Sequence, residues 1–495
     1  MTKHLIHLRS FLLLVSLIVF SFPLFSQDTI PSSRDATEVL IGTFRGNDLR
    51  NYYGRGAPDN LQVVWKLYLG KGRTVISRKL GERIWAGAGW TGQPLLVREG
   101  GKLFLIQGAY DHHLKKIDAT TGRLVWQYLF DDVVKGTGTI WHNPHPRTAE
   151  EAYLILQGSR LGTQHYMDAP HIPSFRAVSL LTGRELWRLD SKWTDSYSRD
   201  VDGSALIVND TVYIGLENSL FTLLDPDPAR ATVRDSMLQP RILKEIRLYH
   251  RQDVIDHKYN VVTESSPARL GRSIFITSGS GHVFRYNMDR QLLDWDFYTG
   301  SDMDGSPVVT RDSCILVSIE KQYIPGPGGV FKLDPRRPPG RAVVWYFPTQ
   351  NDSVGSWEGG VIGTAAVNDA ERPAGQPPLA AFAGIDGYLY LVRHDSLQGD
   401  TLVTGPDSLS RYPVPVLLDR YRIGPSISSP LISGDKLIAA SYNGLFLFRI
   451  TGGEGSPRLQ LLDRFIAPFE ATPIVWKGHL YLASRNGYLY CFGKQ

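Results

Sequence analysis

A phrase made of an acidic or polar residue, two small residues and usually proline recurs along the chain, and it contains the side chains best suited to chemistry. Its copies begin at Thr91, Trp141, Asp202, Glu264, Asp304, Glu358, Ile427 and Glu470. Neighbouring carboxylates repel one another unless solvent, protons or a cation offset their charge. A hard cation such as Ca²⁺ prefers several oxygen ligands. Three interpretations stand open for these acids: caps of local turns, a cation or ligand site, and catalytic carboxylates.

A second acid and several tryptophans accompany some copies. Asp200 and Asp202 form an Asp-x-Asp pair, and the same spacing returns at Asp302 and Asp304. Because alternate residues of a strand share one face, these four are the candidate metal ligands. Trp90 and Trp357 flank the phrase and predict either a stacking wall for a flat ligand or sugar, or packing beneath a loop. The candidate ligand-binding residues are Asp202, Glu264, Asp304, Glu358, Glu470, Trp90, Trp141 and Trp357.

A longer repeat indicates which elements position these residues. An apolar strand, a short loop, Thr-Gly, a basic residue and a tryptophan run from Lys116 to Trp126 and return from Ala177 to Trp187. After each acidic phrase come an alternating apolar strand, a turn such as Asp386-Gly387, and another strand. Four antiparallel strands are the unit of a propeller blade. We therefore predict an all-β fold, an eight-bladed β-propeller of four-stranded antiparallel blades.

The two ends of the repeat region predict how the ring closes. The last repeat stops at Gln495 without a fourth strand, whereas the first begins with an unaccompanied strand at 61–70. Pairing this N-terminal strand with the last blade would close the ring and remove two exposed edges. We expect the propeller to span 61–495 and residues 27–60 to form an extension across one face.

The first residues have the pattern of a secretory signal peptide. Lys3 and Arg9 precede an apolar run from Phe11 to Phe25, which is too short to span a bilayer. We expect cleavage after Ser26, which would remove 1–26. No cysteine follows the run, so no lipid anchor is expected. The mature chain is expected to be a periplasmic or extracellular monomer without a transmembrane segment.

The composition argues against several functions. The net charge is +5, and the lysines and arginines are scattered without a basic stripe, so a nucleic acid partner is not expected. The chain lacks a Gly-x-Ser-x-Gly nucleophile elbow, a phosphate-binding loop and a dinucleotide fingerprint. Cys314 and Cys491 fall in strands of different repeats, which predicts two buried free thiols.

Histidines and long loops supply further candidates. Six of the 13 histidines lie between His112 and His171. They lack the compact spacing of a zinc site, so we expect a surface cluster. Residues 157–174 enlarge the second blade, and residues 369–379 with 395–412 enlarge the sixth. Long loops on a rigid ring often carry recognition.

The segment from Ile117 to Trp126, with Asp, Thr-Gly and Trp at matching places, resembles the repeats of the PQQ-like (quinoprotein alcohol dehydrogenase-like) β-propeller superfamily. The resemblance covers nearly everything from Leu61 onward. It implies that each repeat tryptophan docks on a neighbouring blade, and that positions near Ile246, Tyr421 and Phe465 have lost this residue. The docking tryptophans would be Trp65, Trp126, Trp187, Trp295 and Trp345.

The superfamily contains branches with different chemistry. One resembles the quinoprotein dehydrogenases, which hold PQQ and a calcium or lanthanide ion in the central channel beside an adjacent Cys-Cys disulfide; this chain lacks that cysteine pair. Another consists of non-catalytic propellers of the bacterial envelope. The leading hypothesis is a secreted, non-enzymatic binding platform for a protein or glycan partner. The alternatives are a PQQ- and metal-dependent dehydrogenase, with Asp202, Asp304 or Glu358 as base, and a carbohydrate-active propeller.

Overall fold

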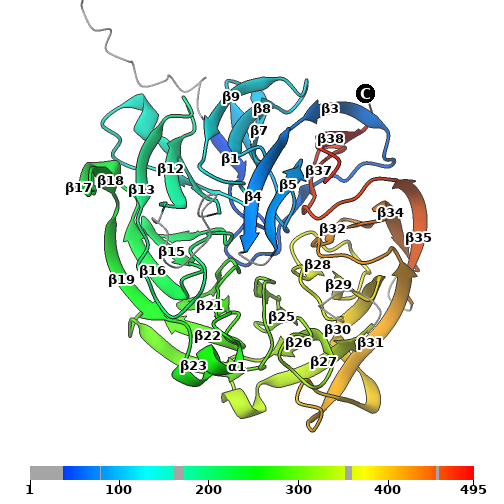
Figure 1. Ribbon diagram of the computed structural model, residues 1–495. Coiled ribbons are helices and arrows are strands. Elements are labelled where there is room, and N and C mark those ends of the chain that lie inside the picture. Colours follow the sequence, from blue (N-terminus) through cyan, green and yellow to red (C-terminus); the bar gives the residue numbers. More distant parts are fainter. Residues whose placement is uncertain (1–36, 78–79, 161–171, 352–358, 453–455, 495) are drawn as a thin grey trace, which may run out of the picture.

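Eight antiparallel sheets follow one another around a central axis in the computed structural model of the chain (Figure 1). The residues that the structure describes are 37–77, 80–160, 172–351, 359–452 and 456–494. The predicted signal peptide therefore lies outside the described residues. Within them, helical structure is limited to α1 (Arg251–Asp256) and three short 3-10 turns, η1 (Ala149–Glu151), η2 (Pro228–Arg230) and η3 (Pro339–Arg341). The prediction of an all-β, eight-bladed propeller is confirmed.

The first four blades run from residue 95 to residue 298. Blade one contains β6 (Leu95–Glu99), β7 (Lys102–Gly108), β8 (His113–Asp118) and β9 (Leu124–Leu129), with β1 (Glu38–Ile41) added beside β6. Blade two contains β10 (Thr139–His142), β11 (Tyr153–Gly158), β12 (Phe175–Ser179) and β13 (Glu185–Leu189). Blade three contains β14 (Leu206–Val208), β15 (Thr211–Gly215), β16 (Leu220–Asp225) and β19 (Arg241–Arg247). Blade four contains β20 (Ala268–Leu270), β21 (Ser273–Thr277), β22 (His282–Asn287) and β23 (Leu292–Tyr298).

The other four blades complete the ring. Blade five contains β24 (Val308–Val309), β25 (Ile315–Ile319), β26 (Gly328–Leu333) and β27 (Val343–Thr349). Blade six contains β28 (Ala366–Val367), β29 (Leu379–Ala383), β30 (Tyr388–Thr404) and β31 (Arg411–Arg422). Blade seven contains β32 (Leu431–Ser433), β33 (Lys436–Ser441), β34 (Gly444–Thr451) and β35 (Arg458–Phe465). Blade eight contains β36 (Ile474–Trp476), β37 (His479–Ala483), β38 (Tyr488–Gly493) and β3 (Val63–Tyr68), with β2 (Gly54–Arg55) beside β36. Two hairpins stand outside the blades: β4 (Lys71–Ser77) with β5 (Gly81–Ala86), and β17 (Thr232–Arg234) with β18 (Met237–Gln239).

The ring closes between the two ends of the propeller. Strand β3 pairs antiparallel with β38, so that Trp65 lies opposite Cys491 and Lys66 opposite Tyr490. The N-terminal strand therefore supplies the fourth strand of blade eight, as predicted. Cys491 and the other cysteine, Cys314, are both buried free thiols.

The repeat tryptophans link each blade to the next. Trp65 Nε1 donates a hydrogen bond to Ala119 O at 3.0 Å, and Trp126 Nε1 donates to Leu180 O at 3.2 Å. The same bond joins Trp187 to Pro226, Trp295 to Arg337 and Trp345 to His394. Four of the acceptors follow the third strand of the next blade, and His394 lies within the third strand of blade six, β30 (Tyr388–Thr404). The docking role implied by the resemblance is therefore present at all five residues.

The glycine of the Thr-Gly pair makes room for this docking. Gly122 has φ +73°, and a Cβ atom there would lie 2.7 Å from the ring of Trp65. Gly183 has φ +74°, and its Cβ would lie 2.8 Å from the ring of Trp126. Glycine alone combines this backbone conformation with a close approach of an aromatic ring. The recurring Thr-Gly and Trp are therefore two halves of one contact between blades.

Three blades replace the tryptophan with a polar residue that still reaches its neighbour. The strand register places these residues two positions earlier than expected, at Lys244, Asp419 and Asp463. Lys244 Nζ donates to Gln291 O at 2.5 Å. Asp419 accepts from the backbone N–H of Leu459, and Asp463 accepts from that of Leu61, each at 2.8 Å. The link between blades survives as a polar contact.

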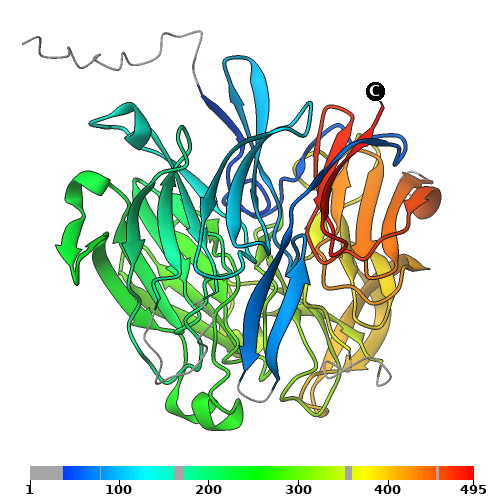
Figure 2. The ribbon, with the colours of Figure 1, turned by 45° about the horizontal axis from the view of Figure 1, so that its top comes forward.

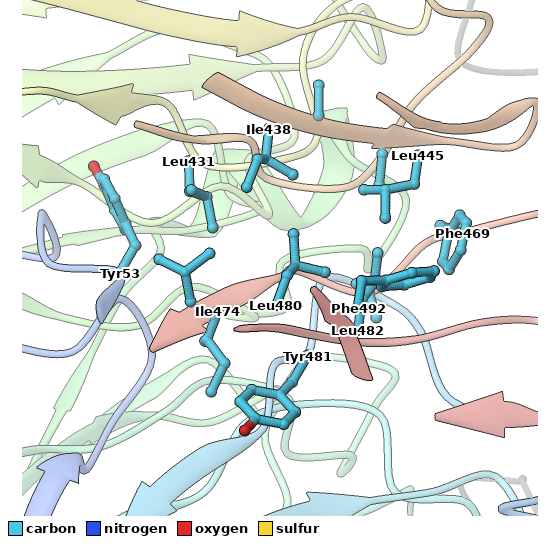
Figure 3. Close-up of a cluster of buried hydrophobic side chains, with 14 of the residues drawn as sticks. Tyr53, Leu431, Ile438, Leu445, Phe469, Ile474, Leu480, Tyr481, Leu482 and Phe492 are labelled. Atoms are coloured by element: carbon cyan, nitrogen blue, oxygen red, sulfur yellow. The ribbon is translucent and has the colours of Figure 1, made fainter. Parts of the chain in front are cut away.

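The largest hydrophobic core joins blades seven and eight (Figure 3). Ile438 and Leu445 face Leu480 and Phe492 across the boundary between these sheets, and all four side chains are fully buried. Alternate residues of each strand point to one sheet face, so every sheet buries apolar side chains against both neighbours. The ring is thereby a rigid scaffold for residues near its axis.

Residues 37–55 enter the ring along its inner strands. Arg45 and Arg50 are fully buried and donate to backbone carbonyls of four blades. Arg45 donates to Pro430 O at 2.6 Å and to Ala365 O at 2.8 Å. Arg50 donates to Pro267 O at 2.8 Å and to Ala205 O at 3.2 Å. This segment fastens the innermost strands together.

The two ends of the ring carry different loops. Each innermost strand begins at the end where the acidic phrases lie, which we call the acidic face; the hairpin β4–β5 and α1 belong to it. The opposite end carries residues 37–55 and the hairpin β17–β18, and we call it the N-terminal face. In Figure 2 the blue hairpin β4–β5 and the green α1 lie at the lower side, and the dark blue β1 lies at the upper side. Among the described residues, no helix has the length and apolar character needed to cross a lipid bilayer.

The enlarged sixth blade has two parts. Residues 395–412 extend the hairpin β30–β31, which packs against β27 of blade five. Residues 372–378 border a cavity of about 570 Å³ that is also lined by Arg311 and Arg393. Of the long insertion in blade two, residues 161–171 lie outside the described part of the chain.

Candidate functional site

A ring of hydrogen bonds aligns the acidic phrases around the axis. At the third position of the phrase, Ser204 N–H donates to Ser266 Oγ at 2.9 Å, and Ser266 N–H donates to Ser306 Oγ at 2.8 Å. Ser306 N–H then donates to Thr364 Oγ1, and Thr364 N–H to Ser429 Oγ, each at 2.9 Å. The small residues of the phrase therefore link blades three to seven in succession, and they fix where its first residue stands.

This ring corrects the alignment in two blades. In blade two, Thr137 accepts from Gln93 N–H at 2.8 Å, so the first position belongs to Lys135 and not to Trp141. In blade six, Thr364 occupies the third position, so the first position belongs to Ile362. Glu358 and Trp357, which had been assigned to this rim, lie outside the described residues. The first positions in blade order are Thr91, Lys135, Asp202, Glu264, Asp304, Ile362, Ile427 and Glu470.

Trp141 is placed away from the acids. It is buried within the second and third blades, and its indole Nε1 donates to Asp210 Oδ1 at 3.0 Å. Asp210 lies in the turn between β14 and β15, which belongs to the N-terminal face. The phrase Trp141-His-Asn-Pro144 is thus the end of an innermost strand, not its beginning.

A buried lysine occupies the centre of the first acidic group. Lys135 Nζ lies 2.5 Å from Asp202, 3.6 Å from Asp200 and 3.9 Å from Glu217. Burial alone would lower the pKa of Lys135, but Asp202 and Glu217 raise it well above its ordinary value. Arg160 Nε completes the network with a hydrogen bond of 2.8 Å to Asp200. Asp200 and Asp202, expected as metal ligands, therefore face protein cations.

Trp90 fills the space beside this network. Its Nε1 donates to Glu264 Oε2 at 2.7 Å, and Lys135 Nζ lies 5.1 Å from the centre of its ring. The indole ring of Trp90 also packs on the buried cluster of Ile362, Ile385 and Ile427. Trp90 thus reaches from blade one to blades four, six and seven, and it occupies the channel with a side chain of the protein itself.

A second acidic group has no cation partner among the described residues. One carboxylate oxygen each of Asp302, Asp304 and Glu320 lie within 4.8 Å of one another. Asn260 Nδ2 donates to Asp302 Oδ2 at 2.8 Å, and Gln322 Nε2 donates to Glu320 at 2.7 Å. Such a group holds protons at neutral pH or binds a cation.

The protonation of this group follows from its surroundings. Burial, and then Glu264, raise the pKa of Asp302 to about 7. Burial, and then Asp302, raise the pKa of Asp304 well above its ordinary value. Burial, followed by Asp304 and Asp302, does the same for Glu320. The predicted pair Asp302 and Asp304 is therefore brought together, and Glu320 joins it.

Glu470 stands in a separate setting. Arg485 Nη1 lies 2.6 Å from Glu470, and the hydroxyl groups of Tyr442 and Tyr110 donate to it at 3.1 Å and 3.3 Å. The Glu470 carboxylate therefore has an ion-pair partner from its own blade and hydrogen-bond donors from both neighbouring blades. The arrangement matches the interpretation of these acids as structural anchors.

Sequence reasoning missed the residues that come from the turns between second and third strands. Glu217 and Glu320 each follow the second strand of their blade, two residues after a small residue, Gly215 or Ser318, in the last two positions of that strand. The recurrence of an acid there in blades three and five was a usable signal. No sequence signal marked Lys135 and Arg160, because an isolated basic residue belongs to no repeated spacing.

The predicted histidine cluster is divided between the two faces. His112 lies in the turn between β7 and β8 on the acidic face, and His113 begins β8, where its Nδ1 stands 3.2 Å from Asp111. His142 and His145 lie at the end of β10 on the N-terminal face. His165 and His171 lie outside the described residues.

The channel residues do not fit a bound quinone with three carboxylates. Lys135, Arg160 and Arg485 are each paired with an acid of the protein. A further anion would meet the carboxylates of both acidic groups, and the aromatic ring of Trp90 is already packed. Asp302, Asp304 and Glu320 offer the oxygen ligands that Ca²⁺ prefers.

Comparison with known proteins identifies a family model that matches the chain. Residues 62–337, more than half of the chain, match a family model described as "Outer membrane protein assembly factor BamB". No curated protein matches the chain in sequence.

Two solved structures share the fold. The quinohemoprotein alcohol dehydrogenase of Comamonas testosteroni is 11% identical with a TM-score of 0.56, and the match covers 92% of this chain and 81% of that one. A europium-containing methanol dehydrogenase is 12% identical with a TM-score of 0.55, covering 92% of this chain and 98% of that one. Likeness at this identity establishes a common fold and leaves function to be argued from the site.

Proposed function

The chain belongs to the PQQ_2 family of PQQ-like β-propellers, described as outer membrane protein assembly factor BamB, and from this membership we propose that it is a non-enzymatic binding platform of the cell envelope. Its partner is a protein, held on the acidic face. The family description names assembly of outer membrane proteins, which is a process of the cell envelope. The expected signal peptide would deliver this chain to the envelope.

The observation that carries the proposal is a belt of exposed aromatic side chains beside the second acidic group. Tyr259 is 56% exposed and Tyr323 is 40% exposed. Asn260 connects them to the acids, because its Nδ2 bonds both the Tyr323 hydroxyl at 3.1 Å and Asp302 at 2.8 Å. Aromatic residues are enriched at protein interfaces, where they supply large contact areas.

The belt continues along the loops of neighbouring blades. Tyr197 N–H donates to Tyr259 O at 3.2 Å, which joins the loop after blade two to the loop after blade three. Trp193 and Ile255 on these two loops are 46% and 65% exposed. Exposed side chains from two loops between blades, and from the turn between β25 and β26 of blade five, therefore stand on the acidic face.

The charge of this region favours a basic partner segment. Asp302, Asp304 and Glu320 have no cation partner among the described residues, and Asn260 places Tyr323 directly beside them. A lysine or arginine from a partner would relieve the repulsion within this group. A partner segment that carries aromatic or aliphatic residues next to a basic residue therefore matches both features.

The packing of the channel supports a binding role over quinone chemistry. Trp90 and Lys135 fill the axial space, and Asp202 and Glu264 are engaged with them. A binding platform uses its rigid outer surface, so a filled central channel does not hinder its function. The geometry therefore supports recognition at the rim of the ring.

A binding experiment tests this proposal. The chain without residues 1–26 is immobilised and incubated with detergent-solubilised envelope proteins, and the retained protein is identified, purified and titrated. The double variant Tyr259→Ala/Tyr323→Ala should bind it at least about 10-fold more weakly, since truncating an aromatic hot spot costs about 2 kcal/mol or more. The matched control is Val233→Ala, at a residue that is 72% exposed on the N-terminal face, and it should bind normally.

Two outcomes would reject the proposal. Retention that survives protease digestion of the extract but not periodate oxidation would identify a glycan. Equal affinity of the double variant and the control would remove the acidic face as the binding surface.

A further inference from the structure

Two histidines and an aspartate converge at the edge of blade four. His250 Nε2 lies 3.1 Å from Asp296 Oδ2, and His282 Nδ1 lies 2.6 Å from Asp296 Oδ1. One ligand atom from each of the three residues falls within 4.8 Å of the others. The cluster is separate from the carboxylate groups of the central channel.

Rigid elements hold two of the three residues. His282 begins β22 and Asp296 lies in the paired strand β23, where His282 stands opposite Tyr298 and Phe284 opposite Asp296. Phe284 stacks on the His282 ring with centroids 5.1 Å apart and planes 14° apart, and Tyr298 lies 4.6 Å away. Neighbouring strands therefore fix the His282 ring and the Asp296 carboxylate on one sheet face.

The third residue is supplied by the helix on the acidic face. His250 precedes α1, and its backbone N–H donates to Asp253 Oδ2 at 2.6 Å. The His250 side chain is 62% exposed, whereas that of His282 is 8% exposed. The cluster is therefore anchored in the sheet and open to solvent on one side.

A second carboxylate stands behind the buried histidine. Asp253 Oδ2 lies 3.3 Å from His282 Nε2, on the side of the ring away from Asp296. Asp253 is itself buried. His282 Nε2 is buried and makes no hydrogen bond to the described residues, so it is available to this carboxylate. A carboxylate that accepts from one ring nitrogen orients a histidine whose other nitrogen binds a metal, and it fixes the required tautomer.

The spacing suits a small divalent ion of the later transition series. Zinc binds histidine nitrogen at about 2.0–2.1 Å and carboxylate oxygen at about 2.0–2.2 Å, so tetrahedral ligand atoms lie roughly 3.3 Å apart. The two histidines contact different oxygens of Asp296, at 3.1 Å and 2.6 Å, and the three ligand atoms lie within 4.8 Å of one another. Rotation of the exposed His250 and of the carboxylate would bring them to the separation that zinc requires. Nitrogen ligands exclude Ca²⁺ and Mg²⁺, which prefer oxygen.

We propose that His250, His282 and Asp296 form a binding site for a divalent transition metal, with Zn²⁺ as the best match. Asp253 is the residue that orients His282, and solvent occupies the fourth position. The ion ties α1 to β22 and β23 and thereby stabilises the part of the acidic face that carries Ile255 and Tyr259. This inference goes beyond the proposed function and does not rest on it.

Zinc titration of the purified chain, without an affinity tag and after treatment with EDTA, tests the site. Calorimetry with ZnCl₂ should give about one tightly bound ion per chain, and the same titration with CaCl₂ or MgCl₂ should give none. Zinc should raise the melting temperature, because an ion that binds only the folded state stabilises it. Co²⁺ in place of zinc should give the visible absorption of a four-coordinate nitrogen and oxygen site.

Variants locate the ion. His250→Ala changes an exposed residue, so it should fold normally and lose the tight zinc site and the cobalt spectrum. Asp296→Asn should do the same. Asp253→Asn should weaken zinc binding about 10- to 100-fold, as removal of an orienting residue does. The matched control, His145→Ala, removes an exposed histidine on the N-terminal face and should bind zinc like the wild type.

Three results would overturn the inference. The first is a folded wild-type chain that takes up no zinc. The second is zinc uptake that is equal in the wild type, His250→Ala and Asp296→Asn. The third is a preference for Ca²⁺ over Zn²⁺. In the first case the three residues form only a hydrogen-bonded His-Asp-His chain.

Discussion

Lys135 Nζ lies 2.5 Å from the carboxylate of Asp202 across the boundary between blades two and three, and both side chains are more than nine-tenths buried. Asp200 and Glu217 stand within 4 Å of the same ammonium group. One lysine thereby neutralises acids from two loops of blade three. It converts part of an acidic funnel into a structural ion network.

Replacing this lysine should be strongly destabilising. Lys135→Met keeps most of the side-chain volume but leaves Asp202 and Glu217 buried without their cation, which costs about 3–5 kcal/mol in the free energy of unfolding. Urea denaturation at pH 7 measures the change. The exposed Lys102, the first residue of β7, is the control, and Lys102→Met should change the value by less than about 0.5 kcal/mol. A loss below about 1 kcal/mol for Lys135→Met would contradict the network.

The contact between Trp65 and Gly122 predicts a second effect. Gly122→Ala places a Cβ atom 2.7 Å from the Trp65 ring at φ +73°, so the strain of the backbone and the clash add together. We expect a loss of about 2–5 kcal/mol, from about 1–2 for the left-handed conformation and about 1–3 for overpacking.

Gly271→Ala is the matched control for that measurement. Gly271 has φ +60°, and a Cβ atom there would contact nothing within 4 Å. This variant should lose only the backbone part, about 1–2 kcal/mol. Equal losses for the two variants in urea denaturation would show that the glycine does not serve the docking of Trp65.

The raised pKa of Asp302 predicts a pH dependence of stability. Its folded pKa is about 7, whereas the unfolded value is about 3.9. As the pH rises from about 4 to about 7 the unfolded state releases this proton first, so the wild type loses stability over that window. The penalty is absent below the window and complete above it.

Asp302→Asn isolates this contribution. The amide oxygen still accepts from Asn260 Nδ2, but the side chain cannot ionise. The free energy of unfolding of the variant, relative to the wild type, should therefore increase between pH 5 and pH 8. A difference that is independent of pH would show that Asp302 is ionised normally in the folded protein.

The buried arginines predict local exchange behaviour. Arg45→Met removes the hydrogen bonds to Pro430 O and Ala365 O that hold residues 37–55 among the inner strands. Hydrogen exchange followed by mass spectrometry should accelerate in peptides from this segment, while β33 and β37 keep their protection. Acceleration spread evenly over all blades would instead indicate that the segment is part of the global folding unit.

Much of the fold could be predicted from the sequence because each repeat combines a strand pattern with a packing residue. The last repeat lacks a fourth strand before Gln495, and the strand around Trp65 belongs to no repeat of its own. Together these two observations predicted that the two strands pair and close the propeller. The Thr-Gly and Trp pattern was visible for the same reason, since both residues serve one contact between blades. The polar replacements Lys244, Asp419 and Asp463 were misplaced by two residues, because the bulge in each outer strand shifts the register.

The site was harder to predict because its alignment depends on side-chain hydrogen bonds. Blade two has no acid-small-small-proline phrase at the correct place, so Trp141-His-Asn-Pro144 was aligned with the other phrases in place of Lys135-Gly-Thr-Gly138. The first position of the phrase in this blade also carries a basic residue, Lys135, where several other blades carry an acid. Glu217 and Glu320 come from turns that the phrase does not include, and they approach Asp202 and Asp304 only when the first three strands of the same blade are assembled.

Site-specific photo-crosslinking tests the central claim, that the acidic face binds a protein, most directly. A photoreactive amino acid is placed at Tyr259 on the acidic face or at Val233 on the N-terminal face, and the intact cells are irradiated. The account predicts one specific crosslinked protein from position 259, attached through a segment with a basic residue, and none from position 233. The same crosslinked product from both positions, or specific crosslinking from position 233 alone, would contradict it.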